Sequence, residues 1–282
     1  MRQFISLLAV VIAAPAFAEE GELEVSAVQG TVHMITGKGG NIGVSAGPDG
    51  LLMVDDKFAD LAAQIRTALN KLGDGPLSFL LNTHYHGDHT GANAAFGLET
   101  PIIAHRNVRV RLTEPDVRPG TLPVVTFDRG LSVHFNGEQI EVVHYPRAHT
   151  DGDAVIFFHG SNVIHTGDIF FHRLFPYVDI DGGGSVRGVI AAVKAILERA
   201  DADTKIIPGH GRLATPEDLR THLRMLEESL RLVQAGMDAG RPLEELQAAG
   251  VGEEWAGFSW GFISTDRWVA TLHRELTATV SE

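Results

Sequence analysis

Apolar and polar residues alternate in short runs through the first part of the chain, and this pattern predicts a β-rich region. The runs 23–30, 31–37, 41–47 and 50–56 are apolar or β-branched and are separated by turn residues. Residues 56–73 change to helical spacing, and Gly73 is expected to end that helix. The continuous apolar run that follows, 77–83, predicts a strand buried on both faces.

The second half of the chain repeats this mixture. Strand-like runs span 131–137, 139–146, 153–160 and 162–168, and a short strand that ends in a loop is expected within 203–211. Amphipathic periodicity predicts helices over 185–200, 215–240 and 262–279, with Ser185 and Thr215 as N-caps. Strands mixed with helices in two comparable halves predict an α/β fold, a sandwich of two facing sheets covered outside by helices.

The first eighteen residues are expected to be a cleaved secretory signal. Arg2 precedes an apolar stretch, and residues 16–18 form an A-x-A cleavage pattern, so the mature chain is expected to begin at Glu19. The alternative is a membrane anchor, but the apolar stretch is shorter than the ~20 residues that a spanning helix needs, and Pro15 interrupts it. Residues 19–282 are expected to form one domain, periplasmic and free of the membrane after cleavage.

Composition narrows the function classes. The formal charge of −13, which becomes −14 without Arg2, makes nucleic acid an unsuitable partner because phosphate contacts need a basic surface. The chain has no cysteine, so it is not a disulfide scaffold. Any bound metal must therefore be held by histidines and carboxylates.

Histidine and aspartate side chains gather where predicted strands end. The run NTHYHGDHTG (82–91) holds four potential ligands within six positions, and more follow in AHTDGD, HTGD and PGHG. A solvated polar loop is the alternative for the first run, but its downstream partners favour a metal site. Seven donors exceed the four ligands of one tetrahedral zinc and suit two ions ~3.5–4 Å apart. The candidate ligands are His84, His86, Asp88, His89, His149, Asp168 and His210.

The run THYHGDHTG resembles the H-x-H-x-D-H signature of the metallo-β-lactamase superfamily, and the later donors follow in that family's order. The resemblance covers about residues 25–280 and implies an αββα sandwich with two zinc ions at one edge of the sheets. It further implies one zinc held by His84, His86 and His149, a second held by Asp88, His89 and His210, and a bridge formed by Asp168.

The resemblance also implies a reaction. The nucleophile would be a hydroxide between the metals, because bound zinc lowers the pKa of water from ~15.7 towards ~7, and zinc would polarise the scissile carbonyl of a small-molecule substrate. Asp88 would be the catalytic side chain that orients the hydroxide and passes its proton to the leaving group.

Three functions compete at this stage. Opening of a cyclic amide, as in a β-lactamase, leads because the protein is expected to be exported. However, Asp168 stands where many such β-lactamases have cysteine, and Phe171 where they offer a carboxylate-binding lysine, with Arg173 as a substitute. The aspartate favours the second function, a lactonase, esterase or thioesterase. The third is a metal-binding accessory protein without catalysis.

Roles around the predicted metal site are also expected for a few residues that are not ligands. His165, and either Asp55 or Asp56, are candidates to orient the metal ligands by hydrogen bonding to them. The aromatic residues within 255–262 are expected to pack in the core or to line a substrate groove. The stretch 173–190, with its glycines 182–184, allows two interpretations: aromatic side chains that contact substrate, or a plain loop-to-helix connection. The aromatic candidates are Phe175 and Tyr177.

Overall fold

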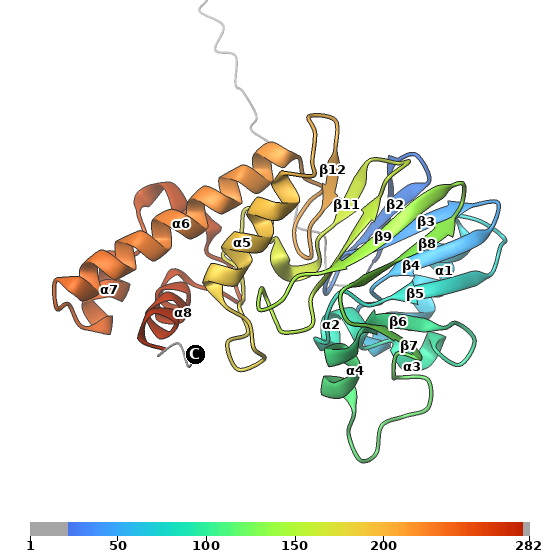
Figure 1. Ribbon diagram of the computed structural model, residues 1–282, viewed down its shortest axis with the longest axis horizontal. Coiled ribbons are helices and arrows are strands. Elements are labelled where there is room, and N and C mark those ends of the chain that lie inside the picture. The colour runs from blue at the N-terminus through green and yellow to red at the C-terminus, as the bar shows by residue number, and fades with distance from the viewer. Residues whose placement is uncertain (1–21, 279–282) are drawn as a thin grey trace, which may run out of the picture.

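The computed structural model describes residues 22–278, so the expected signal segment at 1–18 lies outside the described residues. Two β-sheets lie face to face at the centre, and helices cover the outer face of each sheet (Figure 1). This arrangement confirms the expected α/β sandwich. Within the described range, no helix is both long enough and apolar enough to cross a membrane.

The first sheet holds seven strands in chain order. Neighbours pair antiparallel up to β4 and parallel from β4 onward. The pairings confirm the strands that the apolar runs between 23 and 83 predict. The strands are β1 (Glu24–Gln29), β2 (Val32–Thr36), β3 (Ile42–Gly47), β4 (Gly50–Val54), β5 (Leu77–Leu81), β6 (Ile102–His105) and β7 (Val125–Phe127).

The second sheet has the order β12-β11-β10-β9-β8, antiparallel except for the parallel pair β11 and β12. These strands also match the predicted runs. Their bounds are β8 (Gly130–Phe135), β9 (Glu138–His144), β10 (Ala154–Phe158), β11 (Val163–His165) and β12 (Lys205–Ile207).

Helices flank both sheets. Three short 3-10 helices, Ala59–Leu61, Gly167–Ile169 and Glu253–Phe258, join the α-helices in the described part of the chain. The α-helices are α1 (Ala62–Asn70), α2 (Gly87–Thr90), α3 (Asn93–Phe96), α4 (Arg106–Leu112), α5 (Val186–Leu197), α6 (Pro216–Asp238), α7 (Leu243–Ala249) and α8 (Thr265–Thr277).

Three apolar clusters hold the layers together. The central cluster lies between the sheets, where Leu52 from β4 and Ile156 from β10 are both buried. A second cluster packs α1 on the outer face of the first sheet through residues such as Ile65. The third packs α5, α6 and α8 on the outer face of the second sheet, with Trp268 fully buried. Burial of this apolar surface is the main force that fixes the layers.

The helix caps follow the sequence closely. The Ser185 hydroxyl accepts a hydrogen bond from the Gly188 backbone N–H at the start of α5. Thr215 and Asp218 form a reciprocal capping box at the start of α6. Both predicted N-caps are therefore confirmed.

The helix predicted over 56–73 is shorter than expected. Lys57 has a positive φ of 59°, which no α-helix allows, and α1 ends at Asn70 rather than at Gly73. The apolar pattern also gave no prediction for β6, α4, β7 or α7. These elements have three to seven residues, which is too short for a clear periodicity.

Candidate metal centre

All seven predicted donors meet at one edge of the two sheets, because each follows the end of a strand. The segment after β5 carries four of them and turns into α2. His149 lies between β9 and β10, Asp168 follows β11, and His210 follows β12. The donor atoms form two groups, within each of which they lie at most 4.8 Å apart: His84, His86, His149 and Asp168 in the first group, and Asp88, His89 and His210 in the second.

The first group brings three imidazole nitrogens together. His86 Nδ1 lies 3.1 Å from His84 Nε2 and 2.9 Å from His149 Nε2. Asp168 Oδ2 approaches the same nitrogens, at 3.8 Å from His84 and 3.6 Å from His149. His84 and His149 are buried, whereas the side chain of His86 keeps 19% of its exposure. Access to this group is therefore from the side of His86.

The second group shares the same aspartate. His89 Nε2 lies 3.0 Å from Asp168 Oδ1, and His210 Nε2 lies 3.4 Å from Asp168 Oδ2. His210 Nε2 is also 3.2 Å from Asp88 Oδ2. One oxygen of Asp168 thus faces His89 while the other faces the first group and His210, so this carboxylate contacts both donor groups.

The outward nitrogens of four histidines meet hydrogen-bond partners. His89 Nδ1 lies 2.7 Å from Asp55 Oδ2, and the same carboxylate accepts hydrogen bonds from Thr83. The other contacts are His84 Nδ1 with the Thr83 hydroxyl at 3.0 Å, His86 Nε2 with Asp179 at 3.0 Å and His149 Nδ1 with the Tyr177 carbonyl at 2.8 Å. Such partners orient a ligating imidazole and leave the inward nitrogen free.

Charge is distributed unevenly over the two groups. Burial by itself would lower the pKa of His89, but Asp168 and Asp55 raise it well above its ordinary value. Asp168 likewise raises the pKa of His210 to about 9 against the effect of burial. In the first group, burial lowers the pKa of His149 to about 4. The His149 imidazole is therefore neutral at pH 7, whereas His89 and His210 hold positive charge against the carboxylates beside them.

The donors fit divalent metal ions. His89 Nε2 and Asp168 Oδ1 are buried, and neither makes a hydrogen bond in the described part of the chain although they lie 3.0 Å apart. Buried polar atoms are normally paired, so this geometry calls for a partner that accepts lone pairs from both. Gly40 lies so close to the His89 imidazole that a Cβ there would overlap it. Imidazole and carboxylate donors without thiolate suit zinc and also tolerate other divalent metals.

A family model places this site in a known group. The metallo-beta-lactamase superfamily model matches residues 27–210, which is more than half of the chain and contains all seven donors. The chain belongs to the metallo-beta-lactamase superfamily. This membership confirms the resemblance that the H-x-H-x-D-H run indicates.

Curated relatives of this superfamily member match over part of their length. Hydroxyacylglutathione hydrolases of Mesorhizobium japonicum and Pelagibacter ubique are 29% and 26% identical over 43% and 48% of this chain. The alpha subunit of the 2,4-dinitroanisole O-demethylase of a Nocardioides species is 25% identical over 56% of it. The chain spans about half the length of these relatives, at 48%, 52% and 49% of each.

Solved structures agree on the fold. A metallo-beta-lactamase from Pontibacter korlensis has a TM-score of 0.65 and 17% identity, and covers 73% of this chain with 99% of its own. The DIM-1 metallo-beta-lactamase has a TM-score of 0.64, 19% identity and coverages of 73% and 98%. A double mutant of the sec-alkyl sulfatase PisA1 has a TM-score of 0.68 and 15% identity, and covers 90% of this chain with 50% of its own.

Of the predicted supporting residues of this superfamily member, the structure places Asp55 against a donor, but neither Asp56 nor His165. Asp55 contacts His89, as one of the two aspartates was expected to do, whereas Asp56 binds the backbone N–H of Ala92. His165 does not reach the Asp168 carboxylate. Its Nε2 lies 3.1 Å from the Asn41 carbonyl, and its Nδ1 accepts a hydrogen bond from the Gly167 N–H, so it supports the turn before Asp168.

Arg173 does not approach the metal centre. Its side chain is 74% exposed, and its nearest carboxylate is Asp218 on α6, at 3.9 Å. Phe171 is buried and stacks on the His210 ring with 5.0 Å between centroids. The structure therefore gives no support for the proposed carboxylate grip by Arg173.

The aromatic residues divide between the core and the site. Trp255 is buried, as core packing predicts, and Phe175 is fully buried too, which does not support its role as a substrate contact. Tyr177 lies beside His86 with 5.6 Å between centroids, and its ring also contacts Phe262 at 5.6 Å. Trp260 lies 6.1 Å from the His210 ring. Tyr177, Trp260 and the 47% exposed Phe262 thus provide an aromatic surface beside both donor groups.

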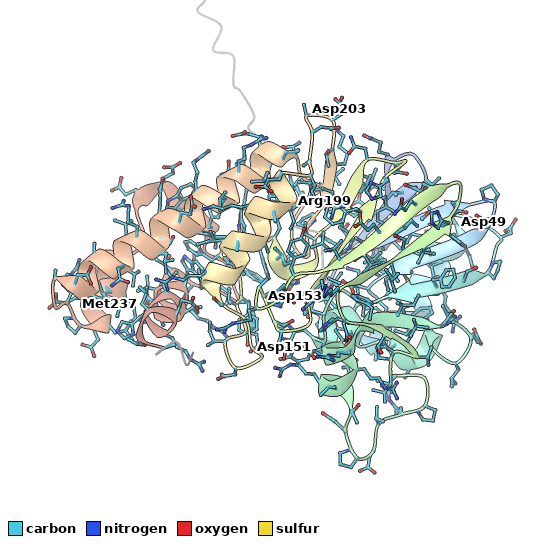
Figure 2. All side chains as sticks on the ribbon, in the orientation of Figure 1. Asp49, Asp151, Asp153, Arg199, Asp203 and Met237 are labelled. Atoms are coloured by element: carbon cyan, nitrogen blue, oxygen red, sulfur yellow. The ribbon has the colours of Figure 1, made fainter. Side chains whose placement is uncertain are left out.

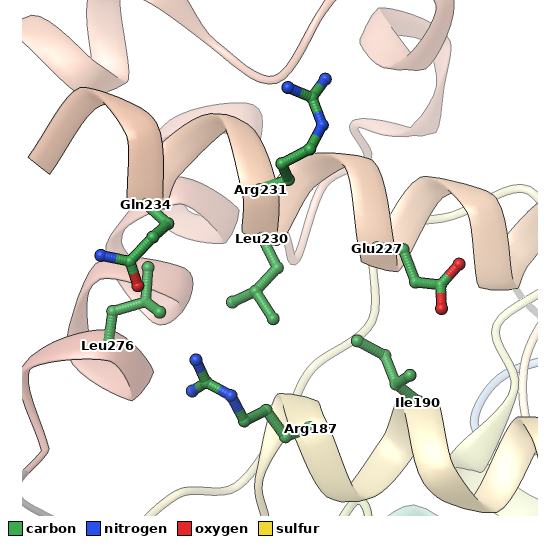
Figure 3. Close-up of a pocket in the computed structure, with 7 residues that line it drawn as sticks. All are labelled: Arg187, Ile190, Glu227, Leu230, Arg231, Gln234 and Leu276. Atoms are coloured by element: carbon green, nitrogen blue, oxygen red, sulfur yellow. The ribbon is translucent and has the colours of Figure 1, made fainter. Parts of the chain in front are cut away.

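A separate groove lies between α5, α6 and α8 (Figure 3). It has a volume of about 400 Å³ and is lined by residues such as Ile190, Leu230 and Leu276, with Arg187 and Arg231 at its sides. None of the seven donors lines it. The groove therefore belongs to the packing of the helices rather than to the metal centre.

Sequence analysis missed three residues close to the donors. Tyr85 and Asp179 hydrogen bond to each other beside His86. The Lys57 ammonium is buried and donates to the Gly40 carbonyl at 2.6 Å, and burial lowers its pKa to about 7. Tyr85 sits inside the H-x-H run and Asp179 stands three positions before the glycines 182–184, and these two positions were the available signals.

Proposed function

We propose that this protein is a zinc hydrolase that uses a dinuclear site to cleave a small-molecule carbonyl compound, with a thioester or ester as the first candidate substrate. The single observation that carries the proposal is the place of Asp168 between the two donor groups, with Oδ1 facing His89 and Oδ2 facing both His149 and His210. Superfamily membership and the seven donors support a metallohydrolase. An accessory protein without catalysis would not need a donor set this complete, so the set argues against that function.

The residues of the site have separate roles in this proposal. The first group, with His84, His86 and His149, would hold one zinc, and the second group, with Asp88, His89 and His210, would hold the other. Zinc bound there would supply an activated water and a Lewis acid for the carbonyl oxygen. Asp88 has a side chain that is 23% exposed and can orient that water and carry a proton to the leaving group. Tyr177, Trp260 and Phe262 would pack against an apolar part of the substrate.

The preference for a thioester or ester rests on two observations. Hydroxyacylglutathione hydrolases are among the relatives, and hydrolysis of that thioester class is the activity their name states. Arg173 points to Asp218 rather than to the site, so no carboxylate anchor for a β-lactam stands at that position. Opening of a β-lactam, which the expected export favours, is the second candidate.

A substrate panel separates these candidates. The purified protein would be tested on an acyl thioester, a simple lactone and a chromogenic cephalosporin, before and after chelation, with zinc measured per chain. Because the chain has no cysteine, a thiol reagent reports thioester cleavage without a background from the protein. We expect two zinc ions and chelator-sensitive thioester or lactone hydrolysis. Cleavage of the cephalosporin alone would favour the second candidate, and absence of both metal and turnover would refute the proposal.

We further propose that the protein is exported to the periplasm. The A-x-A pattern at 16–18 and the apolar stretch before it support this proposal. The mass of the mature protein from fractionated cells would test it. A chain that begins at Glu19 in the periplasmic fraction is expected, and a full-length chain in the cytoplasmic fraction would contradict it.

A further inference from the structure

Asp179 occupies an unusual place for a residue of the loop before α5. It lies 93 positions after His86 in the chain, yet its Oδ2 is 3.0 Å from His86 Nε2. The residue is 7% exposed and its carboxylate accepts hydrogen bonds from both the Tyr85 hydroxyl and the Gly182 backbone N–H, the latter at 2.8 Å. A buried carboxylate with this many donors is built into the fold rather than solvated at the surface.

We propose that Asp179 is a positioning residue that fixes the orientation and tautomer of His86 in the metal centre, an inference that rests on the proposed function. A carboxylate can only accept, so the proton of His86 is placed on Nε2. Nδ1 then presents its lone pair to the space between His84 Nε2 and His149 Nε2, which lie 3.1 and 2.9 Å away. His86 is the most exposed histidine of the first group and needs such support most.

The loop that carries Asp179 orients a second histidine as well. The Tyr177 carbonyl contacts His149 Nδ1 at 2.8 Å, and the Asp179 backbone N–H donates to the His149 carbonyl at 3.0 Å. Two residues of this loop, Tyr177 and Asp179, therefore hold two histidines of the first group. A displacement of this loop would move both nitrogens together.

Glycine is required beside this carboxylate. A Cβ on Gly182 would overlap the Asp179 carboxylate and would approach the Tyr85 hydroxyl. This close approach gives the Gly182–Gly184 run a function beyond a loop-to-helix connection. The glycine lets the backbone N–H reach Asp179 while the side-chain oxygens stay directed at Tyr85 and His86.

The Tyr85 ring is also contacted by Arg111. The Arg111 guanidinium of α4 lies 5.1 Å from the Tyr85 ring centroid and forms two 2.8 Å hydrogen bonds with Asp151, which Figure 2 labels. The Asp151 backbone N–H in turn donates to the Gly182 carbonyl at 3.0 Å. Arg111, Tyr85 and Asp151 thus close a network around the loop that presents Asp179.

The test is the zinc affinity of the full chain, measured by competition with a chromophoric chelator. Substitution D179N cannot satisfy all three donors because an amide has one acceptor oxygen, and D179A removes the acceptor entirely. We expect one of two bound zinc ions to weaken by about 10-fold in D179N and towards 100-fold in D179A. The matched control is D181N, since Asp181 lies two residues away, is 79% exposed and pairs with Arg274 at the surface. Its zinc affinity should not change.

A spectroscopic readout separates positioning from a merely structural role. In zinc-loaded protein with ¹⁵N-labelled histidine, we expect His86 to carry its proton on Nε2, and this signal should broaden or shift in D179N. Substitution G182A should weaken zinc binding in the same direction, because its Cβ displaces the carboxylate, whereas G257A, with open space around it, should not. Thermal unfolding of the metal-free variants identifies any that fail to fold, and D179N, nearly isosteric, is the variant on which the test then relies.

The two proposals fail in different ways. If the natural chain binds no zinc, the proposed function is refuted. If the natural chain binds zinc but D179N, D179A and G182A bind it with unchanged affinity, or His86 carries its proton on Nδ1, only the role of Asp179 is overturned.

Discussion

Two histidines in different parts of this molecule, His210 and His222, are both shielded from water, yet their pKa values shift in opposite directions. At the sheet edge, Asp168 raises the pKa of the half-buried His210 to about 9, against the effect of burial. On the inner face of α6, His222 is 1% exposed and packs 5.1 Å from the Phe170 ring centroid. Neither of its ring nitrogens has a hydrogen-bond partner among residues 22–278, and burial lowers its pKa to about 3.

The difference shows that burial of a histidine does not by itself indicate a site. Burial disfavours the charged form of any imidazole, and His222 shows this effect almost alone. At His210 the carboxylates of Asp168 and Asp88 outweigh burial and raise the pKa of the imidazole. Carboxylates that converge on an imidazole in this way are typical of a functional site. His222 is accordingly part of the core between α6 and the second sheet.

The largest effect is expected from removal of the Asp168 charge at the metal centre. Asp168→Asn keeps the shape of the side chain but removes the charge that both donor groups share. We expect loss of at least one zinc per chain and a fall in kcat/KM of roughly a thousandfold, or about 4 kcal/mol. Metal analysis and kinetics on the active substrate would measure this. Asp203→Asn, at an exposed turn (Figure 2), is the control and should keep both. Full zinc content and activity in the Asp168 variant would exclude a bridging role.

A smaller effect is expected at His222, and it appears in stability. The pKa of His222 is about 3 in the folded chain and about 6.5 when unfolded, so the unfolded chain binds more protons between these values. The contribution of neutral His222 to the free energy of unfolding is fully present above pH 6.5 and is lost as the pH falls towards 3. Between pH 6.5 and 5 this loss is about 2 kcal/mol.

Substitution His222→Leu should remove this dependence. Denaturant unfolding at pH 7 and pH 5 would show a smaller loss of stability on acidification in the variant than in the natural chain. His134→Gln, at an exposed position of β8, serves as the control and should leave the pH dependence as it is. Equal pH dependence in the natural chain and the His222 variant would mean that His222 is not held neutral.

The smallest effect concerns α6 alone. Thr215→Ala removes the capping box at the start of this helix and should lower the free energy of unfolding by about 1 kcal/mol. Because Thr215 contacts none of the donors, zinc content and kcat should stay unchanged. Thr277→Ala is the control, because it makes the same substitution at the C-terminal end of α8, where no N-cap is removed. A loss of zinc in the Thr215 variant would show that the metal centre depends on α6, and the contrast between the two regions would not hold.

The sequence by itself determined most of the architecture and the identity of the donors. Strand runs, helical periodicity and the caps Ser185 and Thr215 are local features, and local energetics decide them. The donors could be found because four stand within six positions and the others stand at strand ends. The shorter elements escaped prediction because three- or four-residue strands such as β6 and β7 carry no measurable period.

Only the tertiary structure decided how these residues meet. His86 and Asp179 are far apart in the chain, and their contact exists because the loop before α5 packs on the segment around His149. Asp55 reaches His89 because β4 and β5 are parallel neighbours, and Arg173 turns away because Asp218 of α6 lies next to it. Sequence spacing fixes which side chains lie at a sheet edge, but orientation and protonation depend on long-range packing, and packing belongs to the folded chain as a whole.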